Sequence, residues 1–544
     1  MHSTPAPRFR SRMLAALSAS CALTAAGAGQ AQVAAESPER PNILWITSED
    51  NGPHLGCYGD TYATTPNLDA LAAQGVRYTH AWSNAPVSSP ARTTLITGMY
   101  PPSLGAQHHR SRAVLPEFAR PFTIYLREAG YYCSNNAKQD YNFETPKGTW
   151  DDSSRKAHWR QRAEGQPFFA VFNFGGTHES RVWPRGDGKT VHDPAEAPIP
   201  PYHPDVPAVR RDWAQYYDNL TALDNRVSQI LQQLEADGLT EDTIVFYFAD
   251  HGPGLARGKR WLYQSGLHVP LIIHFPEKYR HVAPAAAGEI SDRLVGFVDF
   301  GPTVLSLAGI EPPDHMQGRA FLGEHEAQAK EYLFGFRDRL DARHDLSRCV
   351  FDGRYKYIRN YLPHLTQGQY MEYLFRSPTM RAWQEAYDAG TLNEVQAAFF
   401  EPKPAEELYD VLADPHEINN LVDSEEHRRV LTRLRAMLPL WQMCSGDTGL
   451  APELMLRRWR GEQSEWDACQ DPSRYDLPVV LADAQVASEA GPGDATVILE
   501  LLESESPLSC YWGVMACLQL EELSASILER LTALLGGDGG LVAT

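Results

Sequence analysis

A serine and an arginine lie four residues apart at the start of a segment that we expect to be a helix. Pro90 stands between Ser88 and Arg92 and favours a helix start, and the apolar Leu95 and Ile96 continue the helix. Backbone N–H groups and the helix dipole stabilise negative charge at such an N-terminus, which suits a nucleophile. Arg92 lies one turn beyond Ser88, close enough to hold it and its charge. The same five residues also describe an ordinary capped helix, so their meaning depends on the rest of the chain.

Acidic and histidine side chains recur directly after segments that we expect to be buried strands. The expected strands are residues 42–47, 168–174, 243–248 and 269–274. Glu49 and Asp50 follow the first strand, His178 follows the second, and Asp250 and His251 follow the third. Helical segments alternate with these strands, which predicts an α/β fold with a mostly parallel sheet. Ligands bind beyond the carboxyl ends of such strands, so we expect these side chains to gather at one edge and bind a metal or an anion.

The composition excludes some classes of protein. The chain has 544 residues, of which 43% are hydrophobic and 22% are charged, and this is enough apolar material for a large core and more than one domain. The net charge of −20 argues against a nucleic-acid partner. The same charge repels anions, so any anion site has to be a local basic pocket.

The first 31 residues have the pattern of a secretory signal peptide. Arg8, Arg10 and Arg12 precede an apolar, alanine-rich run from 13 to 28, and small residues follow. The run is shorter than the ~20 residues that a membrane-spanning helix needs. We therefore expect residues 1–31 to be removed and the protein to be exported, to the periplasm or to the medium. No later segment is long and apolar enough for a stable membrane span.

The pattern of apolar and polar residues divides the remaining chain into three regions. Residues 40–320 hold the alternating strands and helices of the main α/β domain. Residues 321–445 have the pattern of short antiparallel strands closed by a helix, which predicts a smaller α+β subdomain. Residues 475–544 are predicted to form a helical tail that resembles part of a helical-repeat array. The expected elements are strands 331–336, 347–351 and 355–361, and helices 208–235, 425–441, 498–502, 508–518 and 520–535.

A series of ordered segments resembles the signatures of the sulfatase family, within the alkaline-phosphatase superfamily. They are residues 40–50, 65–72, 88–101, 249–252, 258–263 with 266–270, and 407–421. The motif order is most similar to the sulfamidase and heparan-sulfatase branch. The resemblance implies a sulfuric ester hydrolase with an alkaline-phosphatase-like sheet flanked by helices, a smaller antiparallel subdomain and, outside the resemblance, the helical tail. It also implies that the substrate is a sulfated saccharide, cleaved at an O-sulfate or an N-sulfate.

The resemblance places the reaction at Ser88. In the family this position is oxidised to formylglycine by a sulfatase-maturating enzyme, and the hydrated aldehyde attacks sulfur and then expels sulfate. By the same resemblance Arg92 holds the hydrated aldehyde, Lys138 and His178 contact the sulfate, and Lys259 neutralises the leaving-group side. His178 could also protonate the leaving oxygen.

The resemblance also implies a divalent metal held by Glu49, Asp50, Asp250, His251 and the modified Ser88. Carboxylate oxygens suit calcium, which we favour over magnesium or manganese. Two positions depart from the family pattern, because Glu49 replaces an aspartate and His251 replaces an asparagine. A histidine ligand would admit a softer ion, and His251 could instead contact the substrate.

One departure affects the acid–base chemistry. Asp140 stands where the family has a histidine two residues after the lysine, so either Asp140 takes that role or His108 or His109 reaches in from the loop after the main signature. An arginine pair, Arg337 and Arg339, could clamp a carboxylate or a second sulfate of the substrate. Ordinary ion pairs with neighbouring aspartates are the alternative for these arginines.

Two other functions stay open at this point. A phosphate or phosphonate ester hydrolase of the same superfamily would use unmodified Ser88 as its nucleophile. A non-catalytic glycan-binding protein would account for the departures at Glu49, His251 and Asp140, but it has no need for Lys138 and the other cations.

Overall fold

Eight strands form the large sheet of the computed structural model, which describes residues 40–183 and 188–536. The strand order is β4-β3-β5-β1-β6-β7-β2-β8, and every neighbouring pair is parallel except those that include β7. The strands are β1 Asn42–Ser48, β2 Val76–Trp82, β3 Tyr132–Asn136, β4 Asp152–Ser153, β5 Phe168–Phe174, β6 Thr243–Ala249, β7 Leu271–His274 and β8 Ile290–Gly296. The predicted, mostly parallel α/β fold is therefore confirmed. The predicted signal peptide, 1–31, lies outside the described residues.

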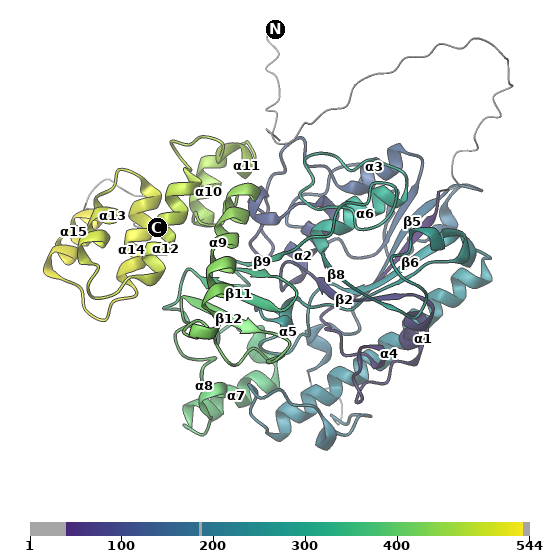
Figure 1. The fold of residues 1–544 in the computed structure, drawn as a ribbon, viewed down its shortest axis with the longest axis horizontal. Helices are drawn as coiled ribbons and strands as arrows, with labels where there is room; N and C mark the ends of the chain where they lie inside the picture. The colour runs from purple at the N-terminus through teal and green to yellow at the C-terminus, as the bar shows by residue number, and fades with distance from the viewer. Residues whose placement is uncertain (1–39, 184–187, 537–544) are drawn as a thin grey trace, which may run out of the picture. The chain divides into compact units, whose positions relative to one another are not determined.

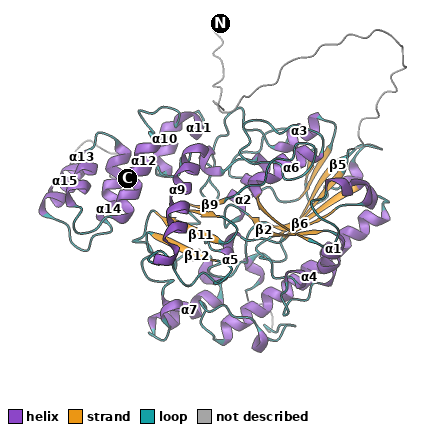
Figure 2. Ribbon diagram, in the orientation of Figure 1, coloured by secondary structure: helices purple, strands orange, loops and turns teal. Residues whose placement is uncertain are grey.

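Helices cover both faces of this sheet because its strands are apolar on both sides (Figure 2). In β1, Ile43 and Trp45 belong to one buried cluster, and Leu44 and Ile46 belong to the other. The first cluster includes α2, α3 and α6, and the second includes α1 and α4. These helices are α1 Pro66–Gln74, α2 Ser88–Thr97, α3 Phe122–Glu128, α4 Pro207–Ala236 and α6 Phe300–Leu307.

The helix α4 shows why its sequence folds as it does. Pro207 occupies the first turn, where a missing N–H costs nothing, and apolar residues then recur at helical spacing. Its buried face includes Trp213, Leu220, Val227 and Leu234. The helix α2 differs, since all ten of its residues are buried, Arg92 included. Gly98 ends α2 with φ 64°, a left-handed conformation in which a side chain is disfavoured.

A second, antiparallel sheet has the strand order β12-β11-β10-β9. Its strands are β9 Leu333–Arg337, β10 Ser347–Phe351, β11 Tyr355–Asn360 and β12 Glu406–Asp410. The helix α9, Arg428–Ser445, covers one face, and Leu434 and Leu438 are buried there with Val350 and Tyr357 of the sheet. The smaller α+β part predicted from the sequence is thus present.

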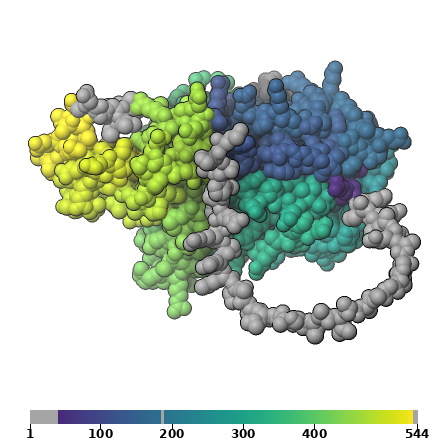
Figure 3. Space-filling model, turned by 90° about the horizontal axis from the view of Figure 1, so that it is seen from above, coloured from purple at the N-terminus to yellow at the C-terminus, as the bar shows by residue number. Residues whose placement is uncertain are grey.

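The described chain contains further α-helices. They are α5 Gln264–Leu267, α7 Pro378–Asp388, α8 Glu394–Ala397, α10 Glu453–Arg460, α11 Glu465–Ala468, α12 Leu477–Glu489, α13 Ala495–Glu503, α14 Pro507–Cys517 and α15 Ala525–Gly536. The last four pack around Trp512 and Ile498 and adjoin the yellow-green residues before them (Figures 1 and 3). The seven cysteines of the described ranges are free thiols. Within those ranges no helix has the length and apolar character to cross a membrane.

Candidate functional site

The ends of β1 and β6 meet beside the N-terminus of α2. The two strands are parallel neighbours, so Asp50 and Asp250 leave the sheet at the same edge. The Asp250 N–H donates to the Ser48 carbonyl at 2.9 Å, and the Asp50 N–H donates to Asp250 Oδ1 at 3.1 Å. This arrangement fixes both carboxylates next to Ser88. The predicted gathering of residues that follow strand ends is therefore seen at this edge.

Ser88 is the first residue of α2 and is 4% exposed. Its Oγ lies 3.2 Å from Nε2 of His251, whose Nδ1 lies 2.9 Å from the Gly252 carbonyl. A carbonyl only accepts hydrogen bonds, so Nδ1 carries the proton and Nε2 presents a lone pair to Ser88. An outer N–H bonded to a backbone carbonyl is the arrangement that metal-binding histidines commonly show.

Asp50 is fully buried, and its two oxygens differ. Oδ2 accepts from the Glu179 backbone N–H at 2.7 Å and from Lys259 Nζ at 2.8 Å. Oδ1 accepts no hydrogen bond within the described residues and lies 3.1 Å from His251 Nε2. The buried carboxylate oxygen and the histidine lone pair are both acceptors, so they repel each other. A cation between them would be attracted to both.

One ligand atom each from Asp50, Asp250 and His251 lies within 4.8 Å of the others, and Glu49, Asp50 and His178 form a second group of this kind. Asp50 belongs to both groups. Two or three carboxylates with one or two imidazoles fit a divalent cation. The donors present therefore fit the predicted metal. His178, which the sequence analysis assigned to the sulfate group, lies next to this metal site.

The predicted cations surround the carboxylates. Arg92 donates through Nε to Asp250 Oδ2 at 3.1 Å and through Nη1 to Asn173 at 2.6 Å. Lys138 Nζ lies 2.9 Å from Glu49 Oε2, 3.5 Å from Asp140 Oδ2 and 3.9 Å from Asp250 Oδ2. Arg92, Lys138, Asp140 and Glu49 are thus brought together, and Asp140 stands beside Lys138.

The imidazole of His178 is oriented by its own loop. The Ser180 N–H donates to His178 Nδ1 at 3.3 Å, and Ser180 Oγ lies 2.9 Å from the same atom. With Nδ1 accepting, the proton of neutral His178 sits on Nε2. The ring centroid of Tyr373 lies 6.5 Å from that of His178, and Trp183 lies 5.1 Å from Tyr373. The guanidinium of Arg376 lies over both rings, 5.3 Å from the centroid of Tyr373 and 5.8 Å from that of Trp183.

Sequence reasoning missed the acid that anchors the second lysine. Glu179 is 4% exposed, and its carboxylate contacts Lys259 at 2.8 Å and Arg260 at 2.9 and 3.1 Å. Arg260 also donates to Asp341 at 2.9 Å. The sequence did offer a sign of this pair, because Glu179 directly follows His178 and Arg260 directly follows Lys259, both of which were predicted site residues.

Burial and charge act in opposite directions on these groups. Burial disfavours the charged form of Lys259, but the carboxylates of Asp50 and Glu179 more than offset it and raise the lysine pKa. Burial likewise opposes ionisation of Asp50, yet Lys259 holds its pKa well below the usual range. The cluster is therefore charged at neutral pH, with each ion matched by a partner.

The histidines of the following loop are placed differently from each other. His109 Nδ1 lies 3.2 Å from Asp341, which joins it to Arg260 and the cluster. His108 is 2% exposed, and its Nδ1 accepts from the Arg339 backbone N–H at 3.3 Å. Burial lowers the pKa of His108 to about 3, so it is neutral. His108 supports the backbone of Arg339 and does not join the cluster.

The two predicted substrate arginines are committed elsewhere. Arg337 is 3% exposed and lies 3.1 Å from Asp345, with Nη1 donating to Gln367 at 2.7 Å. Arg339 donates to Glu453 of α10 at 2.6 Å. The structure does not place either guanidinium at the cluster. Because Arg337 is buried and Arg339 is paired with Glu453, their predicted binding of a substrate carboxylate or sulfate has no support in this geometry.

Comparison with known proteins decides the family. The sulfatase family profile matches residues 41–310, and the profile of the N-sulphoglucosamine sulphohydrolase C-terminal region matches residues 256–397. An ulvan-active sulfatase of Formosa agariphila is 39% identical over 530 residues, which cover 88% of this chain and 86% of that protein. The chain belongs to the sulfatase family. This sulfatase is accordingly a sulfuric ester hydrolase.

Two more distant relatives extend the comparison. The human N-sulphoglucosamine sulphohydrolase is 24% identical to this sulfatase over 465 residues, 74% of this chain and 89% of the human protein. A protein solved in complex with its substrate D-glucosamine-2-N,6-O-disulfate is 19% identical, covers 75% of this chain and 98% of its own, and superposes with a TM-score of 0.55. That last likeness concerns the fold alone. The ulvan-active relative is the more similar to this sulfatase of the two curated proteins described.

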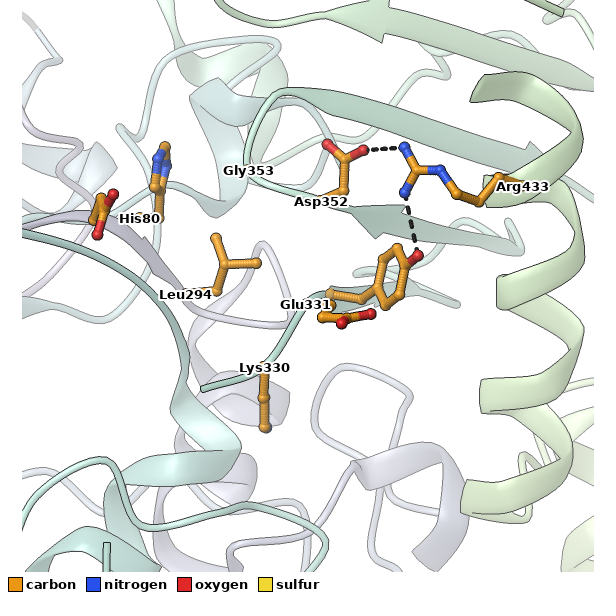
Figure 4. Close-up of a pocket in the computed structure, with 9 residues that line it drawn as sticks. His80, Leu294, Lys330, Glu331, Asp352, Gly353 and Arg433 are labelled. Atoms are coloured by element: carbon orange, nitrogen blue, oxygen red, sulfur yellow. Dashed lines mark hydrogen bonds and ion pairs between the residues drawn. The ribbon is translucent and has the colours of Figure 1, made fainter. Parts of the chain in front are cut away.

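A further cavity of this sulfatase lies apart from the cluster. It is lined by residues of β8, the β10–β11 turn, the segment before β9 and α9, as Figure 4 shows, and it contains none of the residues described above. Arg433 spans it by donating to Asp352 at 2.5 Å and to the Tyr332 hydroxyl at 3.1 Å. These contacts tie α9 to the second sheet.

Proposed function

We propose that this sulfatase is exported, that it removes sulfate from a sulfated glycan, and that it does so through a formylglycine made from Ser88. The observation that carries the proposal is the position of Ser88. It stands at the start of a buried helix, 3.2 Å from His251, at the edge where Asp50 and Asp250 leave the sheet. Arg92 and Lys138 place two cations beside these carboxylates in a chain of net charge −20. A formylglycine at this position would supply, as its hydrate, the oxygen that attacks sulfur.

Asp50, Asp250 and His251, together with the Ser88 position, would hold the metal, and Glu49 is placed to join them through Asp50. We propose calcium, since carboxylate oxygens dominate the donor set. When bound, the ion would polarise a sulfate oxygen and neutralise charge at the reacting centre. Asp50 Oδ1 is buried and accepts no hydrogen bond within the described residues, so a cation bound there would satisfy it.

The remaining side chains divide the work on the sulfate group. Arg92 is locked between Asp250 and Asn173 and holds the Ser88 position. Lys138 reaches the cluster from the β3 side and Lys259 from the opposite loop, so the two ammonium groups flank the carboxylates. His178, with its proton on Nε2, is set to donate a hydrogen bond to the leaving oxygen or to the sulfate. Asp140, 3.5 Å from Lys138, orients that lysine.

The substrate class rests on the relatives. One is named for activity on ulvan, another for N-sulphoglucosamine, and the solved complex contains a disulfated glucosamine. We therefore propose a sulfated polysaccharide or oligosaccharide as substrate, reached in the periplasm or outside the cell. Conversion of Ser88 requires a sulfatase-maturating enzyme as a partner before or during export.

Mass spectrometry of the peptide that contains Ser88, from protein made in its native host, tests the proposal. Formylglycine shows as the loss of two hydrogens from serine. Active protein with an unmodified Ser88 would refute the mechanism and favour a phosphate or phosphonate ester hydrolase, which turnover of aryl phosphates against aryl sulfates would reveal. Native-host protein that binds glycan and hydrolyses neither ester would instead be a non-catalytic homologue.

A further inference from the structure

The loop between Gly105 and Val114 returns to the nucleophile. The backbone N–H of Arg110 donates to the Ser89 hydroxyl at 3.1 Å, and Ser89 directly follows Ser88 in the buried first turn of α2. Ser89 is itself 0% exposed, so this hydrogen bond is shielded from water. Arg110 is therefore anchored one residue away from the position that carries the reaction.

Arg110 has an unusual backbone for its residue type. Its φ is 55°, in the left-handed region, where a non-glycine residue costs on the order of 1–3 kcal/mol and persists only when its surroundings enforce it. Such strain concentrates where a side chain has to be aimed in a particular direction. The hydrogen bond to Ser89 on one side and the contacts of His109 on the other are the enforcing surroundings.

The guanidinium of Arg110 has no internal partner. The side chain is exposed, and within residues 40–183 and 188–536 it makes no hydrogen bond or ion pair. Three other arginines near the site differ, because Arg92 is paired with Asp250, Arg260 with Glu179, and Arg339 with Glu453. Asp341, which contacts the neighbouring His109, is already shared with Arg260. Arg110 thus stands at the rim of the site as a cation without a counter-ion.

The loop is fixed by helices that lie beyond the two family profiles, which end at residue 397. Glu465 of α11 accepts from the Val114 N–H at 3.0 Å, and Arg460 of α10 donates to the Arg112 carbonyl at 3.1 Å. Gly105 has φ 68°, and a Cβ there would meet Glu465 Cβ at 2.3 Å. Figure 1 shows α10 and α11 beside the blue loops that follow α2. This part of the chain holds both ends of the loop against the catalytic domain.

We infer that Arg110 is a specificity-determining residue that binds a second anionic group of the saccharide, a carboxylate or a further sulfate, beside the sulfate that is removed. The inference rests on the proposed function. A guanidinium suits this task because its donors match the oxygens of carboxylates and sulfates in pairs. The chain has a net charge of −20 and repels an anionic glycan, and an unpaired guanidinium at the site offsets that repulsion locally.

Arg110→Gln in the full-length, formylglycine-containing protein tests the inference, with Arg112→Gln as the matched control. Arg112 is also exposed and lacks a side-chain partner within the described ranges, but its backbone is tied to Arg460 and not to Ser89. Arg110→Gln is expected to lower kcat/KM for a doubly anionic saccharide by roughly 10- to 100-fold, as for a lost hydrogen bond between charged groups. It should leave 4-nitrophenyl sulfate turnover unchanged, and Arg112→Gln should change neither.

Two substrate pairs separate the sources of the second anion. D-Glucosamine-2-N,6-O-disulfate against its 6-O-monosulfate tests a second sulfate, and a sulfated uronic-acid disaccharide against its carboxyl-reduced form tests a carboxylate. In each pair, Arg110→Gln should lower kcat/KM only for the saccharide that carries the second anion bound by Arg110, and not for the saccharide that lacks it. Equal losses with both members of both pairs, or equal losses with Arg112→Gln, overturn the inference.

Binding gives a readout that does not need turnover. Calorimetry on Ser88→Ala protein, with and without Arg110→Gln, measures the affinity for the same saccharides. Wild-type protein that hydrolyses no sulfate ester would refute the proposed function, and the calorimetric comparison would still decide the role of Arg110. Unchanged affinity for every doubly anionic saccharide would overturn that role even in an active sulfatase.

Discussion

Replacing Glu179 with glutamine tests whether the buried ion network organises the site. The substitution keeps the size of the side chain and removes one negative charge from a group that is 4% exposed and contacts both Lys259 and Arg260. Removing one partner of a buried pair usually costs about 3–5 kcal/mol. Lys259 keeps Asp50 and Arg260 keeps Asp341, so we expect the lower end, about 3 kcal/mol in the free energy of unfolding.

Urea titration followed by tryptophan fluorescence measures this loss for Glu179→Gln. Glu326→Gln is the control, because Glu326 pairs with Arg293 at the surface and such pairs contribute about 0–1 kcal/mol. Arylsulfatase activity should fall in Glu179→Gln as well, since Lys259 is then held by Asp50 alone, and it should stay unchanged in Glu326→Gln. Equal stability of the two variants would refute the claim that Glu179 holds this network together.

Three other substitutions give separate tests. Burial raises the pKa of Asp338 to about 7, while Asp447 adds to the effect and Arg348 opposes it. Between about pH 4 and pH 7 the folded state therefore holds a proton that the unfolded state has lost. The free energy of unfolding should then fall, as the pH rises through this range, by up to about 1.4 kcal/mol per pH unit. Asp338→Asn should flatten the melting temperature over that range, and an unchanged slope would contradict the assignment. Asp250→Asn should abolish stoichiometric calcium in elemental analysis of purified protein, whereas retention of the ion would exclude Asp250 as a ligand. Asp140→Asn should lower kcat through Lys138 by up to about 5-fold, the worth of a partly exposed ion pair, and full activity would show that Asp140 has no role in turnover.

The sequence was enough to predict which candidate residues lie together because these residues follow strand ends. Buried runs such as 168–174 and 243–248 coincide with β5 and the first six residues of β6, and the carboxyl edge rule then brought Asp50 and Asp250 together. The direction of β7 was not predictable from its composition. The residues Leu271–His274 of β7 are as apolar as those of a parallel strand. The chain between β6 and β7 forms the site loop and only a short helix, without a crossover to the opposite edge of the sheet. The strand β7 therefore starts at the edge where β6 ends and pairs with it antiparallel.

The cations were harder to assign than the acids. Arg337 and Lys259 are both basic residues near predicted strands or motifs, yet one pairs with Asp345 inside the second sheet and the other enters the site. Which carboxylate an arginine meets depends on tertiary packing, and no spacing rule in the chain encodes it. Glu179 was overlooked for the same reason, since an acid next to a predicted histidine looks like surface until its burial is known.

The most direct test of the central claim is the dependence of activity on modification of Ser88. The protein should be produced with and without a serine-type sulfatase-maturating enzyme, and the fraction of formylglycine at position 88 measured by mass spectrometry in each preparation. The account predicts that arylsulfatase kcat rises in proportion to that fraction and is lost in Ser88→Ala. Equal sulfatase activity in preparations with no formylglycine and with full conversion would contradict it.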